Sequence, residues 1–176
     1  MALRALTMAC CCTSAAVAAL TVTPEHFGAV GDGTHDDTKP VRAALAACSA
    51  PSAAPCQVLF AKHYATGPLH INNSSTELHI TGTLAMLPRD AYLKITADQP
   101  PYISNAPGVE QLRIHGGGLI TGIGRQWWPC KYTGCWRPHL IALEGVVGVD
   151  IGPLRMSECD YPCDNPPSIV DARSPI

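Results

Sequence analysis

The sequence is poor in charged and aromatic residues, and its acidic and basic residues almost balance. Charged residues make up 15% and aromatic residues 6% of the 176 positions, and the formal net charge is −2. Without a basic excess there is no electrostatic reason to expect a nucleic acid or an anionic membrane surface as a partner. The hydrophobic share of 47% excludes a disordered tail, and the length suits one domain with a real core.

The sequence also lacks the motifs of several common chemistries. No cysteine couple has the C-x-x-C spacing of a zinc site, G-x-S-x-G is absent, and Gly116–Gly118 is not followed by the Lys-Ser/Thr of a phosphate loop. Five histidines that invite a metal interpretation lack H-x-x-x-H spacing and are scattered over different predicted coils: His63, His70, His79, His115 and His139. We therefore expect no metal ion and no cofactor.

Three aspartates crowd one short stretch between glycines, FGAVGDGTHDDT at 27–38. The spacing of Asp32, Asp36 and Asp37 does not fit the D-x-[DN]-x-[DN]-G loop that surrounds calcium. Turns and helix N-termini use such residues routinely, so a structural role is favoured.

The first residues have the pattern of an export signal. Arg4 precedes an apolar run, and Ala16-Val17-Ala18 offers a small-x-small cleavage site, so residues 1–18 are expected to be a signal peptide. The run is too short and too rich in small residues for a good membrane span. We expect a secreted protein, extracellular or in a cell wall.

Six cysteines remain beyond that segment, in three close couples: Cys48 and Cys56, Cys130 and Cys135, Cys159 and Cys163. An even number in an exported chain implies disulfides, and local pairing is the simplest of several connectivities. Overlapping sequons at Asn72 and Asn73 agree with export and predict a glycosylated surface turn.

Glycine and proline are frequent, with 15 and 16 residues, which favours turns over long helices. One helix is expected at 38–48, where apolar residues follow the i, i+3, i+4, i+7 template and Asp37 or Thr38 can cap the start. Strands are expected at 57–61, 91–95 and 139–145. Three further segments resemble one another, beginning at Leu78, Leu112 and Val149, with intervals of 34 and 37 residues.

Such intervals lie in the range of solenoid repeats. A short strand, a glycine turn and another short strand cannot bury one face alone, whereas coils stacked at about 4.8 Å bury it and pair the backbone in parallel. We therefore predict an all-β fold, a right-handed parallel β-helix with the 38–48 helix capping its N-terminal end. An antiparallel sandwich is the alternative, but two-residue hairpin turns are lacking.

Several of these segments resemble the polygalacturonases, the pectin-degrading glycoside hydrolases of family 28. Phe27–Gly33 with Asp36–Thr38 resembles the opening signature of secreted pectinases. Ile114–Gly124 followed by Trp127-Trp128 is similar to the family's glycine passage and double tryptophan, and Arg137–Ile141 to its R-P-x-L-I strand. The resemblance covers about residues 24–156.

The resemblance implies a secreted glycosidase that hydrolyses pectin or polygalacturonate with inversion, using aspartates and no metal. The family's N-T-D motif, and the D-D pair, G-H-G and R-I-K that follow it, do not occur in this sequence, whose one D-D pair, Asp36-Asp37, belongs to the opening signature. We therefore expect a truncated β-helix that matches only the family's N-terminal portion, with residues 19–156 in the solenoid and 157–176 a divergent tail. No catalytic residue is assigned, and this chain is expected to be inactive. The alternative is a non-catalytic secreted β-helix that binds cell-wall polysaccharide, with self-association through an open solenoid end.

The acidic polysaccharide expected as partner needs aromatic and basic side chains. Trp127 and Trp128 could stack on sugar rings, and Arg125 and Arg137 could meet galacturonate carboxylates. The tryptophans could equally pack against the solenoid wall beside the Cys130 and Cys135 couple, and the arginines could be ordinary surface charges.

Overall fold

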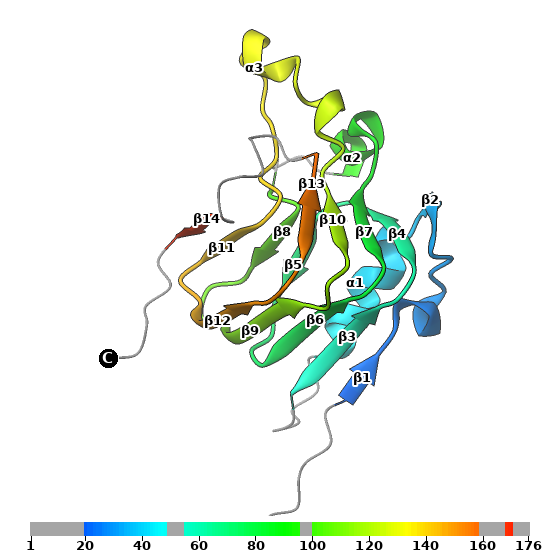
Figure 1. Cartoon of the computed structure of the whole chain (residues 1–176), viewed down its shortest axis with the longest axis vertical. Coiled ribbons are helices and arrows are strands. Elements are labelled where there is room, and N and C mark those ends of the chain that lie inside the picture. Colours follow the sequence, from blue (N-terminus) through cyan, green and yellow to red (C-terminus); the bar gives the residue numbers. More distant parts are fainter. Residues whose placement is uncertain (1–19, 49–54, 96–99, 159–167, 171–176) are drawn as a thin grey trace, which may run out of the picture.

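The fold is a solenoid of parallel strands, seen in a computed structural model that describes residues 20–48, 55–95, 100–158 and 168–170. The strands form three parallel sheets, and the chain visits the sheets in turn as it winds from coil to coil (Figure 1). Sheet I contains β1 (Leu20–Val22), β3 (Cys56–Phe60), β6 (Thr76–Ile80), β9 (Glu110–His115) and β12 (Val147–Ile151). Sheet II contains β2 (Asp32–Asp36), β4 (His63–Thr66), β7 (Thr83–Met86), β10 (Leu119–Thr121) and β13 (Arg155–Ser157). Sheet III contains β5 (Leu69–Ile71), β8 (Ile103–Asn105), β11 (Ala142–Glu144) and β14 (Ser168–Val170), with a bridge from Ile103 to Ile141 joining its two halves.

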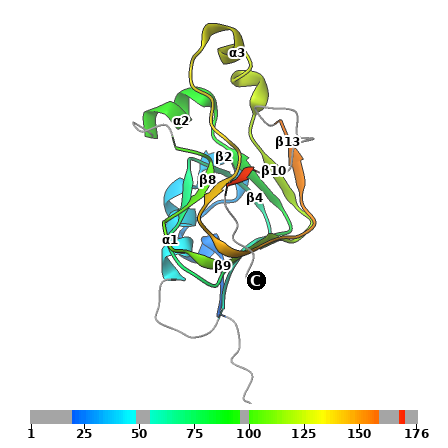
Figure 2. The same ribbon diagram turned by 90° about the vertical axis from the view of Figure 1, so that its left-hand side faces the viewer.

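This topology confirms the predicted parallel β-helix. Every strand pair among the described residues is parallel, and each sheet is built from strands of successive coils rather than from consecutive strands. Viewed along the solenoid in Figure 2, the three sheets enclose a narrow interior, and short helices project at one corner.

The interior is filled by columns of apolar side chains at matching positions of successive coils. Sheet strands such as β3 and β6 alternate buried and half-buried residues, which gives each strand one inward face. The central column of sheet I consists of Val58, Leu78 and Ile114. That of sheet II consists of Tyr64, Leu84 and Ile120, and that of sheet III of Leu69, Ile103 and Ile141. All are buried, so each coil is stabilised by its neighbours, as in other solenoids.

The coil register differs in one place from the sequence prediction. Val149 pairs with Leu112 as expected, but Leu78 pairs with Ile114, two residues beyond the predicted Leu112. Both alignments leave the same face inward, because side chains alternate with a period of two.

The glycine run at 116–118 forms the corner between sheets I and II. A Cβ added at Gly116 would collide with the Ile80 carbonyl oxygen, and one at Gly118 would lie 2.5 Å from that of Gly82. Successive coils therefore approach too closely at Gly116 and Gly118 for any side chain.

The expected N-terminal helix is present as α1 (Thr38–Ala47), preceded by the short 3-10 helix η1 (Pro24–Phe27). Val41, Ala44 and Leu45 are buried, and α1 lies beside β5 at the N-terminal end of sheet III. Arg42 donates from Nε and Nη2 to the Pro68 carbonyl (3.0 and 2.7 Å). A disulfide joins Cys48, after the helix, to Cys56 at the start of β3, which confirms one predicted pairing.

The aspartates of 27–38 have structural roles, but Asp37 does not cap the helix as the sequence predicts. The amide of Thr38 donates to Asp36 (2.9 Å), so Asp36 caps the helix start. Asp37 makes no side-chain cap; it is buried, and its carboxylate accepts from the amides of Val30 (2.8 Å) and Gly31 (3.0 Å). Asp32 accepts from the amides of Thr34 and His35, and these bonds, the one from His35 first, hold its pKa well below the usual range.

Two expectations about secondary structure are wrong. The strand predicted at 91–95 is part of α2 (Arg89–Ile95), a helix that leaves the coil and buries Tyr92. The segment after 156, expected to abandon the strand pattern, contributes β14, which pairs in parallel with β11.

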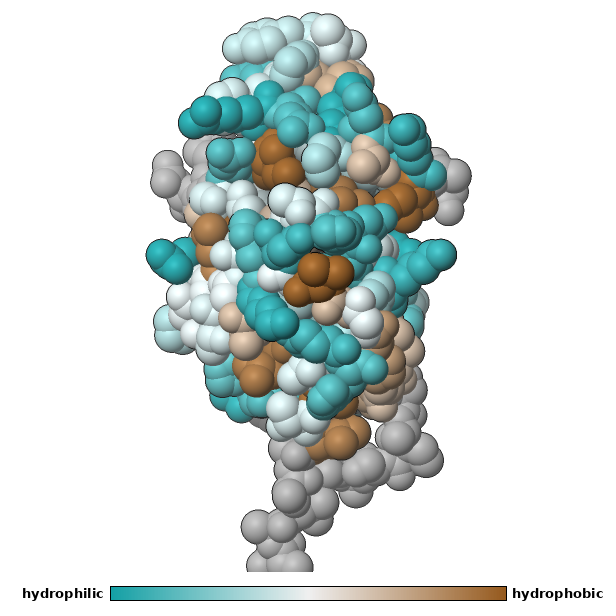
Figure 3. Space-filling model, turned by 90° about the vertical axis from the view of Figure 1, so that its right-hand side faces the viewer, coloured by the Kyte–Doolittle hydropathy of each residue, from teal (hydrophilic) through white to brown (hydrophobic). Residues whose placement is uncertain are grey.

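The side of the molecule on which β2 lies faces the viewer in Figure 3. Hydrophilic residues predominate there, and hydrophobic residues occur in small separate groups. Among the described residues no helix is long and apolar enough to cross a membrane.

Candidate functional site

The coils are interrupted at one corner, between sheets II and III. In the second coil only Gly67 and Pro68 separate β4 from β5. In the third coil residues 87–102 intervene and carry α2; in the fourth, residues 122–141 carry η2 (Gly124–Gln126) and α3 (Cys130–Thr133). We call these two segments the corner loops. Figures 1 and 2 both show α2 and α3 projecting on the same side of the solenoid.

An aromatic cluster holds the corner loops together. Trp127 is buried, and its ring meets Tyr92 of α2 edge-on at 5.9 Å and Trp136 at 5.8 Å between ring centroids. The Arg89 guanidinium lies 5.6 Å from the centroid of the Trp127 ring, a cation–π contact. Trp127 thus packs against the other loop and presents no face to solvent. Of the two roles considered for it from the sequence, packing is therefore the one that the structure shows, and stacking on a sugar is not.

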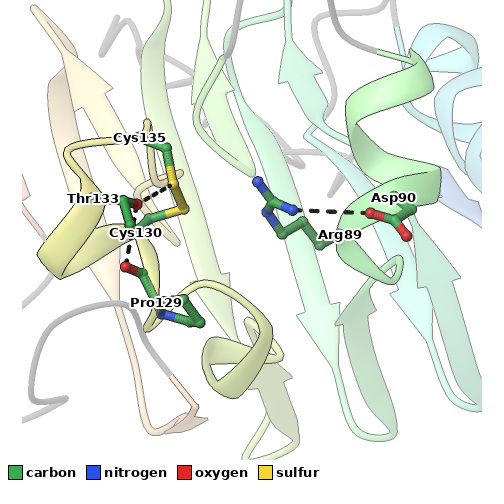
Figure 4. The surroundings of a disulfide bond; sticks show 6 residues. All are labelled: Arg89, Asp90, Pro129, Cys130, Thr133 and Cys135. Atoms are coloured by element: carbon green, nitrogen blue, oxygen red, sulfur yellow. Dashed lines mark hydrogen bonds and ion pairs between the residues drawn. A yellow bond between two sulfur atoms is a disulfide. The ribbon is translucent and has the colours of Figure 1, made fainter.

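A disulfide between Cys130 and Cys135 closes the α3 turn, which confirms a second predicted pairing. Thr133 lies beside it, with Oγ1 3.3 Å from both the Pro129 carbonyl oxygen and Cys135 Sγ (Figure 4). The third couple, Cys159 and Cys163, lies outside the described residues, as does the predicted signal segment 1–18. The corner loops are therefore fixed both covalently and by aromatic contacts.

The described part of the corner loops is strongly basic for so weakly charged a chain. It contains five basic residues and one acidic residue, Asp90. The basic residues are Arg89, Lys94, Arg125, Lys131 and Arg137. The Arg125 side chain is 76% exposed and its Nε lies 3.8 Å from Glu158 Oε1. Trp128 and Tyr132 are exposed, and Lys131 Nζ lies 5.9 Å from the Tyr132 ring centroid. Arg137 is half-buried.

Arg89 lies where the two loops meet. Its amide donates to Gln126 Oε1 (2.7 Å), and its Nη1 lies 4.0 Å from Asp90 Oδ1 (Figure 4). Arg89 Nε and Trp127 Nε1 are buried and donate no hydrogen bond within the described residues. Buried donors without acceptors are costly and uncommon, and each one calls for an explanation.

A second polar cluster lies on the outer face of sheet I, which sequence reasoning missed. Coil stacking places the His79 and His115 rings 4.7 Å apart, and Glu77 Oε1 lies 2.8 Å from His115 Nε2 and 3.8 Å from His79 Nδ1. The feature of the sequence that could have revealed this cluster is the 36-residue interval between the two histidines. That interval equals the length of one coil only when Leu78 is aligned with Ile114.

Glu77 is held by donors on the two neighbouring coils. Gln57 Nε2 donates to Oε1 (2.5 Å), and Arg113 Nη1 donates to Oε2 (3.4 Å) while its Nε donates to Asp150 (3.1 Å). Burial acts to raise the Glu77 pKa. The hydrogen bonds from Gln57 and His115, with the charges of His115 and Arg113, more than offset it, and the pKa is lowered.

The remaining predicted residues are the sequon asparagines, in the turn between β5 and β6. Asn72 is exposed, and Asn73 is half-buried, with Nδ2 3.5 Å from the Leu45 carbonyl oxygen. Asn72 is thus the more accessible of the two.

No family model matches the chain. The fold is similar to that of three solved structures. The first is a protein from Parabacteroides merdae provisionally classed as a glycosyl hydrolase, with a TM-score of 0.60 and 18% identity over 77% of this chain and 64% of that one. The second is the family 28 exopolygalacturonase of Yersinia enterocolitica, with a TM-score of 0.63 and 17% identity over 79% of this chain and 35% of that one. The third is a hyperthermoactive exopolygalacturonase from Thermotoga maritima, with a TM-score of 0.57 and 19% identity over 78% of this chain and 46% of that one.

The chain thus spans from about a third to just under two thirds of the length of these structures. At such identities the likeness establishes the fold alone, a parallel β-helix similar to that of these proteins.

Proposed function

We propose that this chain is a polygalacturonase-like protein that binds acidic cell-wall polysaccharide, such as pectin or polygalacturonate, through its corner loops. The observation that carries the proposal is the charge of these loops, whose sequence has five basic residues against two acids, Asp90 and Asp98, on a chain whose net charge is −2. The fold shared with exopolygalacturonases supports the same ligand class.

The chemistry of the loops suits such a ligand. Galacturonan carries one carboxylate per sugar, and guanidinium groups bind carboxylates with two parallel hydrogen bonds. Trp128 and Tyr132 are exposed beside Arg125 and Lys131 in the sequence, and sugar rings stack on such aromatic faces. Because the disulfide and the Trp127 cluster fix the loops, less conformational entropy is lost on binding.

The same set of side chains argues against hydrolysis by this chain. Inverting glycosidases use two carboxyl groups roughly 6.5–9.5 Å apart, one as acid and one as base. The described corner loops contain Asp90 alone, and Glu158, in the segment after β13, pairs with Arg125. We therefore propose that the 176 residues bind the polysaccharide without turnover, as a non-catalytic β-helix.

We also propose that the protein is exported and bears a glycan on Asn72. The N-terminal pattern supports export, and so do the two disulfides, which persist in oxidising compartments. Mass spectrometry of the protein secreted by a eukaryotic host tests both points, since N72Q should lose the glycan and N73Q should keep it.

Binding and turnover are tested together on the purified chain. Retention on immobilised polygalacturonate should exceed retention on fully methyl-esterified pectin and should fall with salt, because the contacts are ionic. W128A should weaken retention about threefold to tenfold. Equal retention on the two polymers would contradict the binding proposal, and release of reducing ends from polygalacturonate would contradict the absence of turnover.

A further inference from the structure

The cluster on the outer face of sheet I has the ligands of a metal site, although the sequence predicts none. Glu77, His79 and His115 each offer one ligand atom, and the three atoms lie within 4.8 Å of one another. The atoms are Glu77 Oε1, His79 Nδ1 and His115 Nε2, with Glu77 Oε1 at 3.8 and 2.8 Å from the two nitrogens. We propose that these three residues bind a divalent transition-metal ion of the zinc type.

The separations fit a tetrahedral ion after small side-chain rotations. Zinc binds imidazole nitrogen and carboxylate oxygen at about 2.0–2.2 Å, so ligand atoms lie about 3.3 Å apart around it. The two separations from Glu77 Oε1 lie on either side of that value, and the two nitrogens lie within 4.8 Å of each other. Two histidines and one glutamate are a ligand set that zinc uses where a fourth position stays open.

The scaffold keeps the three ligands in place. Glu77 and His79 project from the same face of β6, and His115 is the direct partner of His79 on β9. The coils are fixed by the buried Leu78–Ile114 pair behind the cluster. Ligands carried on rigid strands need little reorganisation to bind.

The surroundings leave access, and the nearby cation is neutralised by an acid of its own. The side chains of His79, His115 and Glu77 are 30%, 21% and 15% exposed, so an ion can reach them and retain a water ligand. A shallow groove of about 540 Å³ borders Glu77 and is lined also by Arg113 and Asp150. Arg113 is the one cation against the cluster among the described residues; it holds the other oxygen of Glu77 and is itself paired with Asp150.

The site lies on a different face from the corner loops and does not depend on the proposed function. The test is titration of the full chain with Zn²⁺ by calorimetry, and with Co²⁺ by visible absorption. Wild type should bind one ion that H79A and H115A each weaken more than about 100-fold, the upper range for merely supporting residues. H26A, which removes an exposed histidine of η1, is the matched control and should bind as wild type does.

Two further measurements distinguish this site from binding at cysteine sulfur or at scattered surface groups. Zn²⁺ should raise the melting temperature of wild type and H26A but not of H79A/H115A, because an ion bound only to the folded state stabilises it. The Co²⁺ complex should show d–d bands without a sulfur-to-cobalt charge-transfer band. Equal binding by wild type and H79A/H115A, or a charge-transfer band that those substitutions leave intact, would overturn the proposal. H79Q/H115Q, which keeps polar side chains on the strands, replaces the double alanine variant if that variant does not fold.

Discussion

At the scale of single residues, the carboxylates of the N-terminal coil serve the fold. Asp37 is buried and joins the start of α1 to the turn at Val30 and Gly31, and Glu25 of η1 joins β4 by accepting from Tyr64 Oη (2.7 Å). Three aspartates within six residues could have indicated an active site. Their contacts are instead with backbone amides and with neighbouring side chains of the same turn.

Asp37→Ala should destabilise the protein by about 1.5–3 kcal/mol, since two amides lose hydrogen bonds to a charged acceptor. Urea denaturation measures the change. Asp90→Ala is the control: that carboxylate is 90% exposed, and its loss should cost less than about 0.5 kcal/mol. Equal effects of the two substitutions would contradict the role assigned to Asp37.

Glu25 should make stability depend on pH in the acid range. Burial acts to raise its pKa, but hydrogen bonds from Tyr64, its own backbone and Lys62, together with the Lys62 charge, lower the pKa below the ordinary glutamate value of 4.5. The stabilisation is therefore complete above about pH 4.5 and is lost as the pH falls through the folded-state pKa.

The comparison is with Glu25→Gln, which keeps an acceptor for Tyr64 but does not titrate. The difference in free energy of unfolding between wild type and E25Q should be constant from about pH 7 to 5 and shrink below about pH 4.5. A difference that stays constant down to about pH 3 would show that the Glu25 charge has no such role.

At the scale of elements, close approach of coils decides where glycine is required. Gly118→Ala should cost about 3 kcal/mol or more, because the new methyl group would lie 2.5 Å from the carbonyl oxygens of Gly82 and Ile80. Gly117→Ala meets open space and should cost only the strain of its left-handed conformation, about 1–2 kcal/mol. Thermal unfolding of the two variants should reproduce this order; the reverse order would contradict the stacked corner.

The Cys48–Cys56 disulfide should contribute about 2–3 kcal/mol by restricting the unfolded chain between α1 and β3. Chemical denaturation of C48S/C56S measures this contribution. A loss of sheet I and α1 together would be consistent with their joint role at the N-terminal end, whereas unchanged stability would contradict the predicted contribution of the bond.

Much of the fold follows from the sequence, and the misses have physical causes. The repeats at Leu78 and Val149, the 38–48 helix and two disulfides are predictable because apolar periodicity and cysteine spacing are local signals. The register at Leu112 is missed because a slip of two residues preserves the inward face. The helix at 91–95 is mistaken for a strand because short apolar runs do not separate the two structures.

The same register error conceals the polar cluster on sheet I. His79 and His115 are 36 residues apart and look scattered in the sequence, yet they are direct partners on adjacent coils. In the corner loops, sequence reasoning identifies Arg125, Trp128 and Arg137 but not Arg89. Contact between Arg89 and Trp127 depends on how two long excursions meet, which no local pattern encodes.

At the scale of the whole molecule, the solenoid separates two polar surfaces. The basic, aromatic corner loops lie between sheets II and III, and the histidine–glutamate cluster lies on the outer face of sheet I. The parallel coils between them are held by buried columns, so the two surfaces should act independently. Mutations in one should leave ligand binding at the other unchanged, since distant sites without shared partners are usually additive.

Calorimetric titration with a defined oligogalacturonate tests the central claim, that the corner loops bind acidic polysaccharide. R125A/K131A removes two corner cations, and K39A/R155A removes two exposed cations from α1 and β13 as a matched control of equal charge. We predict that R125A/K131A weakens affinity about twofold to thirtyfold while K39A/R155A binds as wild type does. Equal losses in both variants would mean that binding follows net charge alone, and undetectable binding by wild type would contradict the claim outright.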